Sequence, residues 1–221
     1  KIRLIGNDTD VYYDRGFCPA FFKKLEKGMI KMKLMLINKD HPLPENYKPC
    51  LTDLMEGYRL ERKTACAMKE MICAALKDGI HLRIFSAYRS ISYQQGLFNE
   101  DIQRYMKQGM SYEDAFNKTA QSIAVPGQSE HNAGLAADIS TMDWKGEINP
   151  EFENTEEFRW LDKNAAKFGF ILRYPKGKEH ITSITYEPWH YRYVGRVHAE
   201  RMKRMGLTLE EYLDLQCAKC D

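Results

Sequence analysis

Helical periodicity and short apolar runs divide this chain into helices and strands that follow no regular alternation. Apolar residues such as Met68 and Met71 recur at helical spacing, which predicts a helix over Leu60–Lys77 that stops at Gly79. The β-favouring residues of His81–Tyr88 predict a strand. The same criteria predict further helices over Ser92–Lys107 and from Ser111, and further strands over Leu34–Ile37 and Phe170–Tyr174.

Capping signals place two more helices in the second half of the chain. Asn154 with Glu157 resembles a capping box, and Thr208 with Glu211 is a second one that opens the last helix. The helix that starts at Asn154 places four apolar residues on one side, Phe158, Leu161, Ala165 and Phe168. Three connecting segments are predicted: an extended His41–Pro44, a turn at Pro175–Lys178 and a hairpin-like return over Ile181–Tyr193.

These elements predict an α+β fold in which helices flank a small, mainly antiparallel sheet. The 221 residues suit one large domain or two small ones, and 43% hydrophobic with 29% charged residues is typical of a globular protein. The net charge of +2, without a dense basic block, argues against a nucleic-acid binder. No apolar stretch is long enough for a membrane span. The chain starts at Lys1 rather than Met, so we expect that an N-terminal signal or anchor has been removed.

The six cysteines permit disulfides without requiring them. Cys66 and Cys73 share a face of a predicted helix, and we expect them to pack there. Cys217 and Cys220 form a Cys-x-x-Cys pair that suits redox chemistry or a second metal, or alternatively a local disulfide or free thiols.

Two separated stretches hold the residues of a hydrolytic metal site. Ser129–Asp138 contains His131 and Asp138, and Glu187–His190 supplies a second imidazole and a second carboxylate. Two imidazoles and one carboxylate leave an open position for water on zinc, and the other carboxylate can act as general base. His131 and Asp138 lie seven positions apart with Gly134 between them, whereas a helical motif holds its ligands three or four positions apart, so a turn that leads into a strand is predicted here.

The second stretch needs a break in regular structure. Glu187 and His190 differ by an odd number, so a regular strand would place them on opposite faces. Pro188 favours a bulge or an edge there, which could turn both side chains into one pocket.

The complete pattern, Ser-x-His-x-x-Gly-x-Ala-x-Asp followed by Glu-Pro-Trp-His-Tyr, resembles the VanY-type D-alanyl-D-alanine carboxypeptidases and their VanX, VanXY and L,D-carboxypeptidase relatives. The resemblance runs from about Leu36 to about Gly195 and implies a hedgehog/D,D-peptidase-like fold. It also implies that His131, Asp138 and His190 bind Zn²⁺ and that Glu187 is the catalytic base and acid. Residues 1–32 lie outside it as an N-terminal extension without an assigned role, and 33–221 form the enzyme domain with the C-terminal helix.

The resemblance implies a second set of residues that bind substrate. Arg89 is the candidate for the free carboxylate of the peptide, which a guanidinium binds with two hydrogen bonds; the alternative is a surface salt bridge. Gln94 and Ser129 match residues that assist binding in relatives. Tyr88 and Trp189 could wall the pocket or, alternatively, pack in the core.

The expected function is zinc-dependent removal of the C-terminal D-Ala from peptidoglycan precursors or muropeptides that end in D-Ala-D-Ala. The alternatives are an L,D-carboxypeptidase, a D,D-dipeptidase, or a non-catalytic zinc module that binds wall peptides; Glu187 argues against the last. The resemblance implies action on the cell-wall side of a bacterial membrane, or in the cytoplasm if the chain is VanXY-like.

Overall fold

The computed structural model of the protein describes residues 34–55 and 57–218. The predicted extension over residues 1–32 lies outside the described part, so the domain division stays a prediction. The strands are β1 (Leu51–Met55), β2 (Tyr58–Glu61), β3 (Leu82–Ser86), β4 (Ala136–Thr141), β5 (Phe170–Tyr174) and β6 (Glu187–Tyr193). The α-helices are α2 (Arg62–Lys77), α3 (Ile91–Lys107), α4 (Tyr112–Thr119), α5 (Glu156–Asn164), α6 (Glu179–Thr182), α7 (Arg196–Met205) and α8 (Leu209–Cys217). Short 3-10 helices are η1 (Glu130–Ala133), η2 (Pro150–Asn154) and η3 (Ala165–Phe168).

The central sheet has the strand order β3-β4-β6-β5, and each neighbouring pair is antiparallel. A separate antiparallel hairpin pairs β1 with β2. This arrangement confirms the predicted α+β class with a small antiparallel sheet. The two long-separated strands β4 and β6 lie in the middle of the sheet, and both carry residues of the predicted metal site.

The main hydrophobic core lies between α2 and the sheet. Met68, Met71 and Ile72 of α2 are buried there together with Ile84 of β3 and Ile139 of β4. The predicted apolar stripe of α2 therefore faces the core, as the helical period requires.

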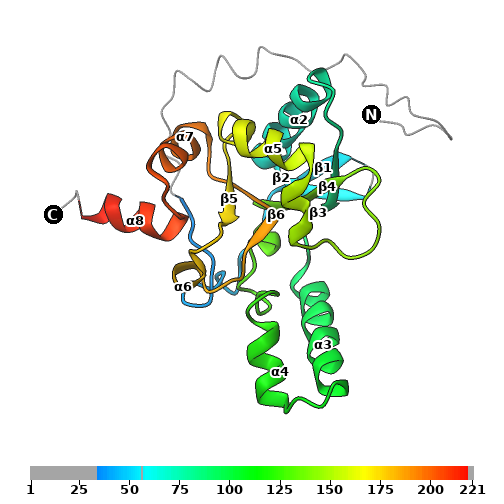
Figure 1. The fold of residues 1–221 in the computed structure, drawn as a ribbon. Helices are drawn as coiled ribbons and strands as arrows, with labels where there is room; N and C mark the ends of the chain where they lie inside the picture. Colours follow the sequence, from blue (N-terminus) through cyan, green and yellow to red (C-terminus); the bar gives the residue numbers. More distant parts are fainter. Residues whose placement is uncertain (1–33, 56, 219–221) are drawn as a thin grey trace.

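The helices α3 and α4 form a hairpin that projects away from the sheet (Figure 1). The hairpin has its own small core of Phe98, Ile102 and Ala115, and the rings of Phe98 and Phe116 meet edge to face at 5.2 Å. Ser90 and Ser111 cap the two helices through their hydroxyl oxygens. Both helices match the prediction.

The prediction of a strand over Leu34–Ile37 is wrong. This segment has no regular structure, and Leu34 and Leu36 pack against a second core formed with α7 and α8. Its apolar residues are explained by that contact, since the segment has no strand partner to pair with.

In the second half of the chain, two predicted elements are divided into shorter ones. The N-cap of α5 is Thr155, whose hydroxyl accepts from the N–H of Phe158, and not Asn154, which ends η2. The predicted single helix ends at Asn164 and continues as η3. The predicted return over Ile181–Tyr193 begins with α6, and only β6 belongs to the sheet.

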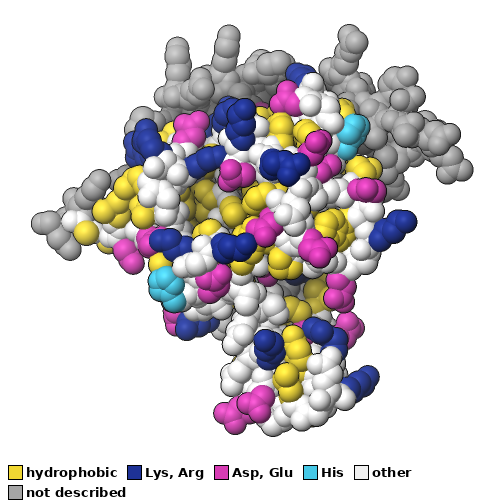
Figure 2. Space-filling view, in the orientation of Figure 1, with side chains coloured by type: hydrophobic (Ala, Val, Ile, Leu, Met, Phe, Trp, Pro, Cys, Tyr) yellow, Lys and Arg dark blue, Asp and Glu magenta, His cyan; other side chains and the backbone are white. Residues whose placement is uncertain are grey.

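Figure 2 shows Lys and Arg side chains interspersed with Asp and Glu on the visible face of the molecule. Within residues 34–55 and 57–218, no helix has both the length and the hydrophobicity needed to cross a bilayer.

The capping box of Thr208 and Glu211 at the start of α8 is confirmed.

Candidate metal centre and active site

A 3-10 turn and a required glycine place the first two site residues. Ser129 caps η1, because its Oγ accepts a hydrogen bond from the backbone N–H of His131 at 3.3 Å. The turn ends at Gly134, where φ is +67° and an added Cβ would lie 2.7 Å from the backbone nitrogen of Glu61. Only glycine fits this left-handed conformation and close approach. The chain passes directly from His131 into β4, which carries Asp138.

The strand pairing places the third site residue. Asp138 of β4 and His190 of β6 are directly opposite each other in the antiparallel ladder, which brings Cβ atoms to about 5 Å. β6 also contains the irregularity predicted from Pro188. Leu172 of β5 pairs with Tyr191 and Tyr174 pairs with Glu187, so two residues along β5 correspond to four along β6. This bulge turns Glu187 and His190 into one pocket despite their odd spacing.

The three predicted ligands converge. Asp138 Oδ1 lies 3.3 Å from His131 Nε2 and 3.2 Å from His190 Nδ1, and the candidate ligand atoms lie within 4.8 Å of one another. Asp138 Oδ1 is buried without a hydrogen-bond partner in the described part of the chain. A buried, unpaired carboxylate oxygen between two imidazoles fits a bound cation, and two nitrogens with one oxygen is a donor set that zinc takes at hydrolytic sites.

A hydrogen-bond partner on the far side of each imidazole orients the ring. His131 Nδ1 lies 2.7 Å from the carbonyl oxygen of Ala87, to which its N–H donates, so the lone pair of Nε2 faces Asp138. His190 Nε2 lies 3.4 Å from Glu130 Oε2, and its Nδ1 faces the site. Such outer partners fix the tautomer of a metal-binding histidine. Glu130 was not predicted as a site residue; its place between two motif residues was the one available signal.

Burial and neighbouring charges perturb the proton equilibria of the site. Burial raises the pKa of Glu187 to about 8. Burial opposes the charged imidazolium of His190, but the nearby carboxylates, Asp138 first, outweigh it and raise its pKa to about 9. Burial likewise opposes the charge of Asp138, yet His131 and Arg89 hold the pKa of that carboxyl well below its usual range. A bound cation would oppose both raised pKa values, because it favours the deprotonated forms of Glu187 and His190.

Arg89 lies at the edge of the metal site. Its Nη2 donates to Asp138 Oδ2 at 2.6 Å and its Nε donates to Ser86 Oγ at 2.8 Å. Its backbone is fixed to η1, because its N–H donates to His131 O and its carbonyl accepts from Asn132 Nδ2. The side chain is 19% exposed, and Nη1 has no hydrogen-bond partner in the described ranges. The guanidinium is thus held beside the ligands and is not a surface salt bridge.

The other predicted substrate contacts occupy different positions. Gln94 is buried in the first turn of α3; its Nε2 donates to Ala124 O at 2.8 Å, while its Oε1 has no partner in the described part. The Tyr88 ring is half-buried under the Arg59 guanidinium, 5.6 Å from the ring centre. Trp189 packs against the main core, which favours the packing alternative for this residue.

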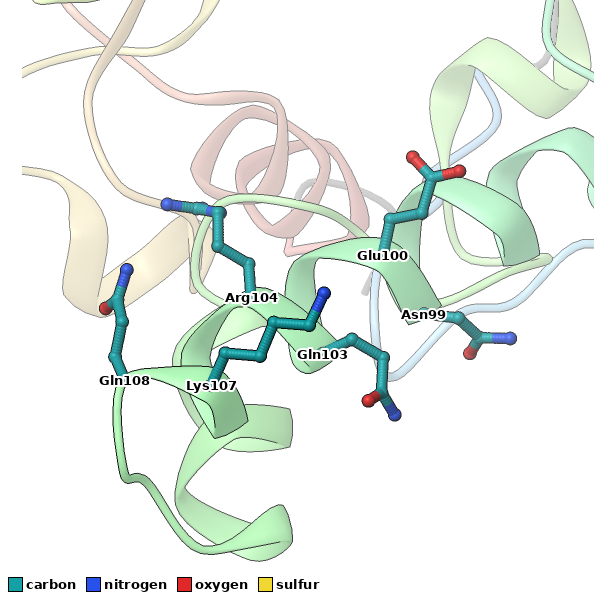
Figure 3. Close-up of a pocket in the computed structure, with 6 residues that line it drawn as sticks. All are labelled: Asn99, Glu100, Gln103, Arg104, Lys107 and Gln108. Atoms are coloured by element: carbon teal, nitrogen blue, oxygen red, sulfur yellow. The ribbon is translucent and has the colours of Figure 1, made fainter.

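A separate surface pocket lies on α3. It is open, and six residues of that helix and its end line it, Asn99, Glu100, Gln103, Arg104, Lys107 and Gln108 (Figure 3). None of them belongs to the predicted site.

The described cysteines show no disulfide. Cys66 and Cys73 lie on α2 as half-buried free thiols, and burial raises the pKa of both, so they pack as expected. Cys217 is exposed, and Cys220 lies outside the described residues.

Comparisons with known proteins identify the family to which the chain belongs. The profile of the family VanY, D-alanyl-D-alanine carboxypeptidase, matches residues 57–196. A D-alanyl-D-alanine carboxypeptidase of Enterococcus faecalis is 38% identical over 183 residues, which cover 83% of this chain and 66% of the relative. The chain thus spans slightly less than two thirds of that relative's length.

Two solved structures share the fold. A mutant of the vancomycin resistance D,D-pentapeptidase VanY from a VanB-type resistance cassette, in complex with Zn(II), matches with a TM-score of 0.73 and 38% identity over 80% of this chain and 97% of that one. VanYB in complex with D-alanine-D-alanine matches with a TM-score of 0.74 and 38% identity over 81% and 96%. With its two motifs converging in space and its profile match over more than half its length, the chain belongs to the VanY family of D-alanyl-D-alanine carboxypeptidases.

Proposed function

We propose that this chain is a zinc-dependent D,D-carboxypeptidase that removes the C-terminal D-Ala from peptidoglycan precursor peptides ending in D-Ala-D-Ala. The observation that carries the proposal is the unpartnered Oδ1 of Asp138 between His131 and His190, with Glu187 Oε2 3.5 Å from His190 Nδ1. Family membership and the Zn(II) complex of a relative support zinc as the cation.

Each residue of the site has a proposed role in hydrolysis. His131 Nε2, Asp138 Oδ1 and His190 Nδ1 hold zinc, which when bound activates water and polarises the peptide carbonyl. Glu187 accepts the proton of the attacking water and passes it to the leaving amine. A purely binding module needs no such carboxylate beside its metal.

The guanidinium of Arg89 supplies recognition of the chain end. It is held by Ser86 and Asp138 through Nε and Nη2, and its remaining donors suit the terminal carboxylate of a peptide. The unpaired Oε1 of Gln94 offers an acceptor in the first turn of the same loop-helix junction. The solved relative with bound D-alanine-D-alanine supports this substrate class.

We infer that the enzyme acts on the cell-wall side of the bacterial membrane, where peptidoglycan is processed. VanY-type enzymes are bacterial and act on the cell wall, and the finer placement is tested by fractionating cells that express the full-length protein.

Mass spectrometry of peptide products tests the reaction. Incubation with a pentapeptide ending in D-Ala-D-Ala should yield the tetrapeptide and free alanine. Release of the intact dipeptide would identify a D,D-dipeptidase instead, and trimming confined to tetrapeptides would identify an L,D-carboxypeptidase. Binding without any cleavage would favour the non-catalytic module.

A further inference from the structure

Two arginines and two glutamates form a buried network that contacts Nε2 of His190, the ring nitrogen that points away from Asp138. Glu130 Oε1 accepts from Arg173 Nε at 2.7 Å and from Arg192 Nη1 at 2.6 Å. The other two nitrogens of Arg173 donate to both oxygens of Glu210 in α8, at 2.9 and 2.6 Å. Arg173, Arg192 and Glu130 are at most 1% exposed.

This network is balanced in charge but is not explained by stability. Two guanidinium groups face two carboxylates, so the group carries no net charge. Buried ion pairs cost so much desolvation that apolar replacements are often equally stable. We therefore expect these buried charges to fix the positions of neighbouring side chains rather than to add stability.

The geometry leads to the metal site. Both guanidinium groups donate to Oε1 of Glu130. Its Oε2 therefore remains to face His190 Nε2, 3.4 Å away. A carboxylate oxygen only accepts, so it favours the tautomer with the proton on Nε2. That tautomer exposes the lone pair of Nδ1 toward Asp138 Oδ1, 3.2 Å away.

We propose that Glu130 is a positioning residue that, held by Arg173 and Arg192, orients His190 and keeps its Nδ1 available for zinc. The proposal rests on the ligand set of the proposed function. It adds to the three proposed ligands a carboxylate, Glu130, that contacts neither the metal nor the substrate and acts through His190.

Glu130→Gln tests this role with almost no change in shape. The single carbonyl oxygen of Gln must face the two guanidinium groups, because these can only donate. Its NH₂ group then faces His190 Nε2 and favours the wrong tautomer. The zinc dissociation constant, measured by competition with a chromogenic chelator, should rise about 10- to 100-fold.

Glu210→Gln is the matched control. It removes the same charge from the same Arg173 but touches no zinc ligand. Its zinc dissociation constant should stay within about threefold of the parent value, since the His190 contact remains. Unchanged affinity in Glu130→Gln, or equal weakening in both variants, would overturn the proposal. A parent that binds no zinc would overturn the ligand set itself.

A measurement on the parent decides the case if Glu130→Gln does not fold. In protein loaded with ¹¹³Cd and labelled with ¹⁵N-histidine, the metal should couple to Nδ1 of His190 and Nε2 of His131. The Nε2–H of His190 should exchange slowly with water, because Glu130 holds it. Coupling to Nε2 of His190, or exchange as fast as in free imidazole, refutes the positioning role.

Discussion

Glu187 and Arg89 act on different parts of the proposed substrate, and their surroundings differ accordingly. Glu187 is buried, with Oε2 3.5 Å from the Nδ1 of His190, and burial raises its pKa to about 8 in the metal-free site. A divalent cation beside this carboxylate favours its charged form. The charged form is the one that a general base requires.

Glu187→Gln should separate catalysis from binding. The variant keeps the shape and the zinc ligands, so zinc content should stay at the parent value. Turnover should fall by roughly two or more orders of magnitude, the usual scale for losing a general base. The exposed Glu147→Gln is the matched control. Near-parent turnover in Glu187→Gln would show that another group carries the proton.

Arg89 should decide between a peptide acid and its amide. An amidated substrate offers no carboxylate to the remaining donors of Arg89, whose Nη2 stays paired with Asp138, so the charge-assisted hydrogen bonds to the chain end are lost. The parent should therefore cleave the acid at least about a hundredfold faster than the C-terminal amide, in kcat/KM. Arg89→Ala should lower the rate on the acid far more than the rate on the amide.

The acid-to-amide ratio is the informative quantity here, because Arg89 also pairs with Asp138 and its loss can change zinc occupancy. A change in occupancy alters both rates alike and leaves the ratio unaffected. Arg89→Lys keeps the charge but not the paired donors, so its ratio should lie in between. Equal parent rates on acid and amide would indicate an endopeptidase.

At the scale of elements, the sequence predicted segments whose signal is local. The periodic apolar face of α2, the strand β5 and the capping box of α8 all agree with the prediction. The β1–β2 hairpin was missed, and the second half of β2, Leu60 and Glu61, was assigned to the following helix. The strand predicted at Leu34–Ile37 was wrong because its apolar side chains meet distant helices.

The site itself was predictable only in part, because contacts between residues far apart in the sequence complete it. Its motif residues predicted the three candidate ligands that the structure brings together, and Pro188 indicated the irregularity in β6. The pairing of Asp138 with His190 is set by the register of two strands far apart in sequence, which no local pattern encodes. The contact from Glu130 to His190 depends on the same long-range register.

The capping box of α8 gives a pH prediction. Glu211 accepts from Lys178 Nζ at 2.7 Å and from the N–H of Thr208 at 2.8 Å. The hydrogen bond from Lys178 is the main cause that lowers the pKa of Glu211. A lowered folded-state pKa gives stability that is present above the ordinary value of about 4.3 and lost as the pH falls through the folded value.

Glu211→Gln should therefore destabilise the protein by about 1 kcal/mol at pH 7, the usual size of a cap. The difference from the parent should shrink as the pH falls through the lowered pKa of folded Glu211, because the parent carboxylate then becomes protonated. Urea unfolding of both proteins at pH 7 and at a series of acid pH values measures it. A difference that does not depend on pH would assign the effect to helix propensity.

At the scale of the whole molecule, the metal site joins parts of the chain that would otherwise be separate. The proposed ligands come from η1, β4 and β6, and the contacts behind them reach both ends of the described chain. Arg192 donates to the carbonyl of Met35 at 2.7 Å, and Arg173 binds Glu210 of α8. Zinc should therefore stabilise the complete fold rather than one loop.

Removal of zinc tests that coupling. A ligand bound only by the folded state, at a hundred times its dissociation constant, adds about 2.7 kcal/mol, which corresponds to roughly 5 to 11 °C in a domain of this size. Treatment with a chelator should lower the unfolding midpoint of the parent by that amount, and added zinc should restore it. The midpoint of His190→Ala should not respond to either treatment, because a ligand is missing. If the parent holds one zinc per chain yet unfolds at the same temperature without it, the ion is bound by a site that does not connect these three segments.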